Sequence, residues 1–144
     1  MVAKLRNRMA SEQSGFTLVE LLVVMLILGL LAAIAIPSFF NQRDKARDAD
    51  AKAGVRSAQT AMETYATDNN GSYAGATPAL LQGIESTLND VTLTVPAVAA
   101  SSYTVRVTSS TGNTFDVVRA AGGTTTQPCT TAGKAGCPSD GTWD

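Results

Sequence analysis

The chain has 144 residues, enough for one small domain and an additional segment. Its 11 basic and 12 acidic residues give a formal net charge of −1, which argues against a general nucleic-acid or anionic-membrane binder. The sequence contains no histidine, so the commonest general base and the commonest metal ligand are both missing.

A long apolar segment follows a basic N-terminal stretch. Lys4, Arg6 and Arg8 come first, and residues 21–40 then run for twenty positions without a charge. About twenty apolar residues span a bilayer core as a helix, which satisfies its own backbone hydrogen bonds in lipid. The basic residues before this run predict a cytoplasmic N-terminus and place everything after about residue 41 on the far side of the membrane.

Two ordinary explanations fit the apolar segment less well. A cleavable secretory signal has an apolar stretch of about 7–15 residues followed by a small-residue cleavage site, and this run is longer and is followed by Asn-Gln-Arg-Asp at residues 41–44. A plain membrane anchor has no use for Glu20, because a carboxylate at the bilayer centre costs on the order of 2–3 kcal/mol. It has no use for Pro37 either, which removes a backbone donor and favours a kink.

The residues around Glu20 carry a family resemblance. Residues 15–24 read Gly-Phe-Thr-Leu-Val-Glu-Leu-Leu-Val-Val, and residues 29–37 read Gly-Leu-Leu-Ala-Ala-Ile-Ala-Ile-Pro. With the short basic leader and the charge-free span, this segment resembles the prepilin signature of type IV pilins and type II secretion pseudopilins. The resemblance covers about residues 15–40, roughly a fifth of the chain.

The resemblance implies a defined processing step. A membrane-embedded prepilin peptidase would cut between Gly15 and Phe16 and methylate the new amine of Phe16. Residues 1–15 would then be a leader peptide, and residues 16–40 would remain as the transmembrane and filament-core helix.

Glu20 becomes the fifth residue of the mature chain on this interpretation. We expect its carboxylate to pair with the Phe16 amine of a neighbouring subunit during assembly, because a matched pair costs far less in a low dielectric than either charge alone. The alternatives are a pair with the amine of its own chain, or a carboxylate that reaches the membrane interface.

Gly29 and Pro37 both weaken an α-helix locally. In the pilin family this stretch can become extended within filaments, and the two residues would permit a helix break here. A static kink is the alternative.

The helix is predicted to continue beyond the membrane, over residues 41–71. An amphipathic stripe with spacings of 4, 3, 4 and 3 is formed by Ala51, Val55, Ala58, Met62 and Tyr65. Two exposed ion pairs are expected along the same helix, Asp48 with Lys52 and Asp44 with Arg47. Asp-Asn-Asn-Gly at residues 68–71 is a stop signal, so a helix from about Thr17 to Thr67 would be some 75 Å long.

Residues 72–144 change character and predict a globular β-sheet head. A short helix is expected to begin at Thr77-Pro78, since proline suits the first helical position. Alternating apolar residues predict strands at residues 91–95, 103–107 and 114–119. Three antiparallel strands with one apolar face need a cover, which the helix stripe supplies. The fold class is therefore α+β: a long N-terminal helix, transmembrane in its first half, packed on a small three- to four-stranded antiparallel sheet, as in pilins.

Both cysteines lie near the C-terminus, at Cys129 and Cys137. Thiols outside the cell usually oxidise, and closing a nine-residue loop would stabilise the fold by roughly 2.5 kcal/mol. A bridge between them would resemble the C-terminal disulfide loop of many pilins, with free thiols as the alternative. No cofactor is expected, although Asp140 and Asp144 could bind calcium with loop carbonyls, as some pseudopilins do.

The scattered carboxylates form no acid–base, phosphate-loop or nucleophile motif, so the chain is not expected to be an enzyme. The predicted function is a structural subunit of a type IV pilus-like filament, with a pseudopilin of a type II secretion system as the alternative. The expected partners are further copies of the chain through the N-terminal helix, the prepilin peptidase, the inner-membrane assembly machinery, and membrane lipid before assembly. The sequence does not predict a nucleic-acid partner, and it does not decide whether the filament serves adhesion, motility, DNA uptake or secretion. The subunit is expected to span the cytoplasmic membrane once and then to enter a cell-surface pilus.

Overall fold

The structure is a computed structural model that describes residues 15–144. It divides into two compact units, one ending at Phe39 and the other comprising Phe40–Asp144, and each is described by itself. Helix α2, Leu18–Asp68, contributes residues to both units. The predicted cleavage site at Gly15 and Phe16 lies within the described part, whereas residues 1–14 of the leader lie outside it.

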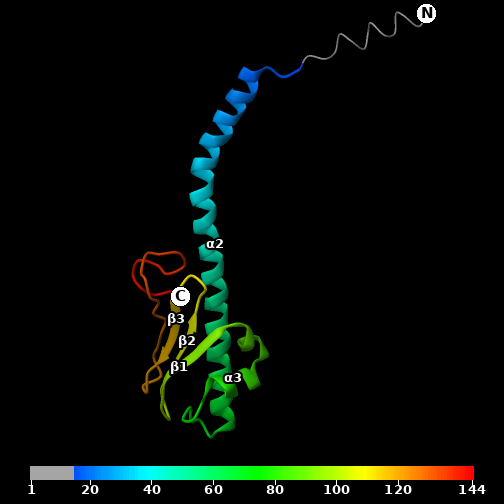
Figure 1. The fold of residues 1–144 in the computed structure, drawn as a ribbon. Helices are drawn as coiled ribbons and strands as arrows, with labels where there is room; N and C mark the ends of the chain where they lie inside the picture. Colours follow the sequence, from blue (N-terminus) through cyan, green and yellow to red (C-terminus); the bar gives the residue numbers. More distant parts are fainter. Residues whose placement is uncertain (1–14) are drawn as a thin grey trace, which may run out of the picture. The chain divides into compact units, whose positions relative to one another are not determined.

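The unit Phe40–Asp144 combines the second part of α2 with a four-stranded antiparallel sheet (Figure 1). After α2 come α3 (Pro78–Ile84) and a 3₁₀-helix η1 (Ser86–Asp90). The strands are β1 (Thr92–Val98), β2 (Tyr103–Thr108), β3 (Thr114–Arg119) and the short β4 (Thr125–Thr126), paired in the order β1-β2-β3-β4. The predicted α+β class and the helix-on-sheet arrangement are confirmed.

Alternation along the strands sets which side of the sheet meets the helix. In β2 the buried side chains are Tyr103, Val105 and Val107, every second residue. The register places Val105 opposite Val117 and Val107 opposite Phe115, so β3 continues the same apolar face.

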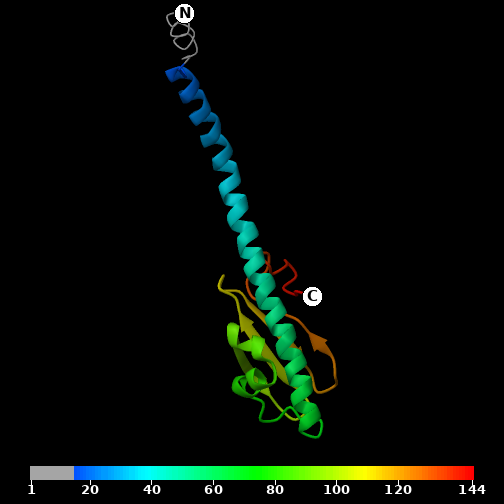
Figure 2. The ribbon, with the colours of Figure 1, turned by 90° about the vertical axis from the view of Figure 1, so that its right-hand side faces the viewer.

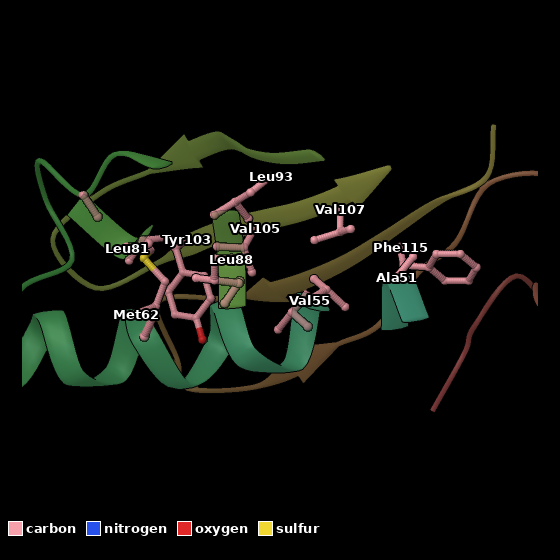
Figure 3. Close-up of a cluster of buried hydrophobic side chains, with 14 of the residues drawn as sticks. Ala51, Val55, Met62, Leu81, Leu88, Leu93, Tyr103, Val105, Val107 and Phe115 are labelled. Atoms are coloured by element: carbon pink, nitrogen blue, oxygen red, sulfur yellow. The ribbon is translucent and has the colours of Figure 1, made fainter. Parts of the chain in front are cut away.

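The predicted helix stripe covers this apolar face. Figure 3 shows Val55 and Met62 of α2 pointing toward Tyr103 and Val105 of the sheet. Val55 and Met62 are fully buried. Each such side chain contributes about 1.5–3 kcal/mol of transfer free energy, so the stripe is the main attachment of helix to sheet. The described core also includes residues outside the stripe, among them Ala61, Ala66, Leu81 and Leu88.

The helix ends where the stop signal predicts. Asn70 and Gly71 adopt left-handed φ values of 55° and 82°, and the Gly71 N–H donates to the Ala66 carbonyl over 2.7 Å. Asparagine and glycine tolerate this conformation with little strain, so the turn caps the last carbonyls of α2. Helix α3 begins as expected, with the Thr77 hydroxyl accepting the Leu80 N–H at 3.4 Å.

Strand β1 is longer than predicted. It runs to Val98 and passes through Pro96, with a register shift against β2 between Thr94 and Ala97. Proline has no backbone N–H to donate to a neighbouring strand. It is tolerated in β1 because an edge strand has one side with no partner strand and because the bulge accommodates the missing hydrogen bond. The alternation ends at the bulge, which is why the pattern predicted only residues 91–95.

A partly buried polar cluster connects the end of α2 with the sheet. The Glu63 carboxylate accepts the hydroxyls of Tyr73 at 2.8 Å and Tyr103 at 3.0 Å, and Arg119 lies 3.5 Å from it. Burial, followed by the hydrogen bond to Glu63, raises the pKa of Tyr103, so its hydroxyl remains a donor at physiological pH.

Candidate functional site

The residues expected to act in assembly lie at the start of α2. The Glu20 carboxylate accepts hydrogen bonds from the Thr17 backbone N–H at 3.1 Å and from the Thr17 hydroxyl at 2.9 Å. The Glu20 N–H donates back to the Thr17 hydroxyl at 3.2 Å. This reciprocal arrangement is a capping box, which satisfies donors left over at a helix N-terminus. The single chain therefore gives Glu20 a local partner that sequence reasoning missed, although the Thr-x-x-Glu spacing is the signal for it.

The side chains that follow Glu20 form a continuous apolar surface. Helix α2 has an 18-residue window of mean hydropathy 2.9, long and apolar enough to cross a membrane. Its large apolar side chains remain exposed in the single chain, for example Met25 at 68% and Leu26 at 72%. Such exposure is far beyond the scattered apolar residues of an ordinary surface and indicates burial in lipid or against other chains.

Gly29 and Pro37 lie inside α2, which is assigned as one helix from Leu18 to Asp68. The described single chain is therefore helical at both positions. No atom outside the helix lies within 4 Å of the place where a Cβ on Gly29 would be, so the glycine is not required by close packing in this chain. A helix break at the two residues remains a prediction about the filament.

A second site lies in the head and was not predicted. Asp48 is fully buried and accepts hydrogen bonds from Thr111 Oγ1 at 2.5 Å, Asn113 Nδ2 at 2.7 Å and the Gly136 N–H at 2.9 Å. One carboxylate thus connects α2 with the β2–β3 turn and with the disulfide loop.

The position of Asp48 corrects the predicted Asp48–Lys52 pair. Among the described residues no ion pair joins them, and the Lys52 ammonium instead lies 5.5 Å from the centre of the Phe115 ring. Asp48 precedes Ala51 by three positions and so continues the apolar stripe toward the N-terminus. The sequence signal for a buried Asp48 was a carboxylate at a position that the spacing assigns to the apolar stripe. The other predicted pair is confirmed, with Arg47 at 3.6 Å from Asp44.

Two opposing effects act on the Asp48 carboxyl group. Burial raises its pKa, but hydrogen bonds donated by Ser109, Thr111, Gly136 and Asn113 favour the charged form and together lower the pKa below its usual value. The group is therefore a charged carboxylate at neutral pH, and its charge is stabilised by uncharged donors and not by an ion pair within residues 15–144.

Gly136 makes this contact possible. A Cβ at Gly136 would lie 2.4 Å from the Asp48 Cβ, closer than two carbon atoms can approach. The neighbouring residue Cys137 forms a disulfide with Cys129, with Cα atoms 5.8 Å apart. The loop is thus closed by the disulfide and bound to α2 by Asp48.

The chain end is also part of the head. Trp143 is 3% exposed and donates its indole N–H to the Asp116 carbonyl at 2.9 Å. The Arg56 guanidinium lies over the Trp143 ring, 5.2 Å from the ring centre. Asp140, named above as a possible calcium ligand, accepts the Thr142 N–H at 3.1 Å. Within residues 15–144 no three His, Cys, Asp or Glu side chains gather in a way that could hold a metal ion.

Comparisons with known proteins agree with the two-part organisation. Residues 11–36 match the family model described as the prokaryotic N-terminal methylation motif. Residues 37–132, two thirds of the chain, match the model described as the type IV minor pilin ComP, DNA uptake sequence receptor.

Similar individual proteins come from two kinds of system. The type IV wide pilus major component PilA4 of Thermus thermophilus is 40% identical over 90 residues, 62% of this chain and 68% of that protein. The type II secretion system core protein G of Pseudomonas aeruginosa is 39% identical over 74 residues, 51% of this chain and 49% of that protein. The type IV major pilin protein PilA of Myxococcus xanthus is 34% identical over 64 residues, 44% of this chain and 29% of that protein.

The helix-on-sheet head, the exposed apolar helix and the two matching family models lead to one assignment. The chain belongs to the family of type IV pilins and type II secretion pseudopilins.

Proposed function

We propose that the chain is a structural subunit of a type IV pilus-like filament, assembled by packing of its N-terminal helix after a leader is removed. The observation that carries the proposal is the exposed apolar surface of α2, present on a chain whose head already has its own closed core. Among the described residues, the core of the head uses no side chain from the first part of α2. The apolar surface of that part is therefore available for lipid and then for identical helices.

Processing is part of the proposal. The prepilin peptidase cuts between Gly15 and Phe16, and the Phe16 amine is methylated. The match of residues 11–36 to the N-terminal methylation motif supports this step. Glu20 then changes partner, from the capping box with Thr17 in the single chain to the Phe16 amine of a neighbouring subunit in the filament. Gly29 and Pro37 permit local unwinding of the helix there.

The partners and location follow from the same steps. The subunit spans the cytoplasmic membrane once with its N-terminus inside, meets the peptidase and the assembly machinery there, and enters a surface filament of identical copies. It has a structural role and not a catalytic one, and it needs no metal for this role, because the Asp140 carboxylate already accepts the Thr142 N–H.

A pseudopilin of a type II secretion system is the alternative, favoured by the similarity to core protein G. The disulfide loop supports the pilus, because a covalent closure suits a surface that must persist outside the cell. The aligned region also covers a larger share of PilA4 than of core protein G, 68% against 49%.

Immuno-electron microscopy at native expression separates the two. We expect labelled surface fibres of micrometre length that disappear when the gene is deleted, with secretion of exoenzymes unchanged. Label confined to the envelope, together with loss of secreted enzymes on deletion, would refute the pilus and favour the pseudopilin.

A further inference from the structure

A polar cavity of about 470 Å³ lies beside the disulfide loop, within the unit Phe40–Asp144. Figures 1 and 2 both show this C-terminal loop, in red, next to α2. Helix α2 lines the cavity with Asn41 and Lys45, and the loop lines it with Lys134, Ser139 and neighbouring residues. Two ammonium groups, an amide and a hydroxyl are the donors that bind an anion.

Neither lysine of the cavity has an ion-pair partner among the described residues. The ion pairs of residues 15–144 join Arg47 to Asp44, Arg106 to Asp116 and Arg119 to Glu63. The nearby carboxylates of Asp48 and Asp140 keep their negative charge, but their oxygen atoms accept hydrogen bonds from donors of the head and from the Thr142 N–H.

The loop side of the cavity is held in place before any ligand binds. The Lys134 carbonyl accepts the Asn113 amide N–H at 3.1 Å, the Gly136 N–H is bound to Asp48, and the disulfide closes the loop. None of these contacts uses the Lys134 ammonium, so that group is free to face a ligand. A prearranged site loses less entropy on binding.

The cavity lies close in the chain to the apolar run. Asn41 is the first residue after residues 21–40, and Lys45 is the fifth. Because α2 continues without interruption, Lys45 lies about 7 Å along the helix beyond the run, at about 1.5 Å per residue. The headgroup layer on each side of a bilayer is roughly 5–8 Å thick, so this is the depth of the lipid phosphates.

The first charged residues beyond the apolar run are mostly basic. Residues 41–47 contain Arg43, Lys45 and Arg47 against Asp44, and the acidic residues Asp48 and Asp50 follow them. Segments next to a membrane span usually carry excess lysine and arginine on the cytoplasmic side, whereas this segment is predicted on the far side. Basic pockets at membrane surfaces bind anionic headgroups, and such binding would explain basic residues at this position.

We propose that the cavity between Lys45 and Lys134 binds the phosphate of an anionic phospholipid headgroup, and that this contact docks the head on the bilayer before assembly. The step rests on the proposed function, because it requires a subunit inserted in a membrane. When the subunit enters the filament, contacts with other subunits replace the headgroup. The site is therefore occupied only in the membrane-inserted subunit before assembly.

The test uses the full mature chain in nanodiscs of phosphatidylcholine that contain phosphatidylglycerol, with the retained lipids counted by native mass spectrometry. We expect phosphatidylglycerol to be retained in preference to phosphatidylcholine. Near a membrane surface each cation contributes about a fivefold change in affinity, so Lys45→Gln with Lys134→Gln should lower retention by roughly 25-fold, and less at high salt. Neither substitution removes a hydrogen bond described above.

Arg43→Gln is the matched control. It removes a cation at a similar depth that does not line the cavity, so it should lower retention by no more than the roughly fivefold effect of a general surface charge. Lys45→Gln alone also loses the headgroup contact and should lower retention further. Equal losses from Arg43→Gln and Lys45→Gln would overturn the pocket and leave only general surface charge. Retention without lipid preference in a well-inserted chain would overturn the inference while sparing the proposed function, whereas a chain that fails to insert would overturn both. Lysine-dependent binding of a short DNA duplex, with no lipid preference, would assign the cavity to nucleic acid instead.

Discussion

Glu20→Ala is expected to lower the yield of sheared filaments by more than about 100-fold, since removing one partner of a buried ion pair costs about 3–5 kcal/mol. The subunit itself should remain inserted in the membrane, because the apolar run is unchanged. Filament yield relative to the amount of subunit in the membrane fraction measures the effect.

Two further variants separate the ion pair from the capping box. Glu20→Gln keeps a side-chain oxygen that can accept the Thr17 N–H but removes the charge, and it should lose filaments as Glu20→Ala does. Thr17→Ala removes the hydroxyl that bonds Glu20 but keeps the carboxylate, and it should assemble close to normally. Normal filaments from Glu20→Gln together with defective filaments from Thr17→Ala would show that capping, and not charge pairing, is the role of Glu20.

Asp48→Ala is expected to destabilise the head by about 3–5 kcal/mol, because it leaves the buried Asn113 amide and the partly buried donors of Thr111 and Gly136 without their acceptor. Urea unfolding of the full chain in detergent measures this, followed by the emission of Trp143, the single tryptophan. Asp50→Ala, an exposed carboxylate on the same helix, is the matched control and should change stability by less than about 0.5 kcal/mol.

Acid should reproduce part of the Asp48 effect. Because folding lowers the pKa of Asp48, its contribution is fully present above the unfolded pKa of about 3.9 and is lost as the pH falls through the lower folded pKa. The wild-type chain should therefore lose stability below about pH 4 more steeply than Asp48→Ala. Parallel acid profiles for the two chains would contradict the assignment.

The elements of the fold were predictable where the sequence carries a period. The stripe from Ala51 to Met62 and the alternation in β2 each bury one face, so position in the sequence determines position in the core. In β3 the alternation is incomplete, because Asp116 is buried as well as Phe115 and Val117. Strand β1 was predicted only up to its bulge, because the shift between Thr94 and Ala97 interrupts the period of two.

The Asp48 cluster was not predictable in the same way. Its donors lie 63, 65 and 88 positions away in the chain, so no local pattern connects them with the carboxylate. The glycine needed for close approach, Gly136, is one of twelve glycines in the sequence, and only the backbone path shows that it faces Asp48. The roles of Gly15, Phe16 and Glu20 in processing and assembly could be proposed from the sequence because these residues form a short contiguous motif, and they stay predictions.

The intact mass of the subunit in sheared surface filaments tests the central proposal most directly. We predict a chain that begins at Phe16, carries a single methyl group on its N-terminus, and keeps residues 16–40 together with an oxidised Cys129–Cys137 pair. A subunit that retains Met1, a chain that begins after residue 40, or filaments that lack this chain would contradict an assembly built on the retained N-terminal helix.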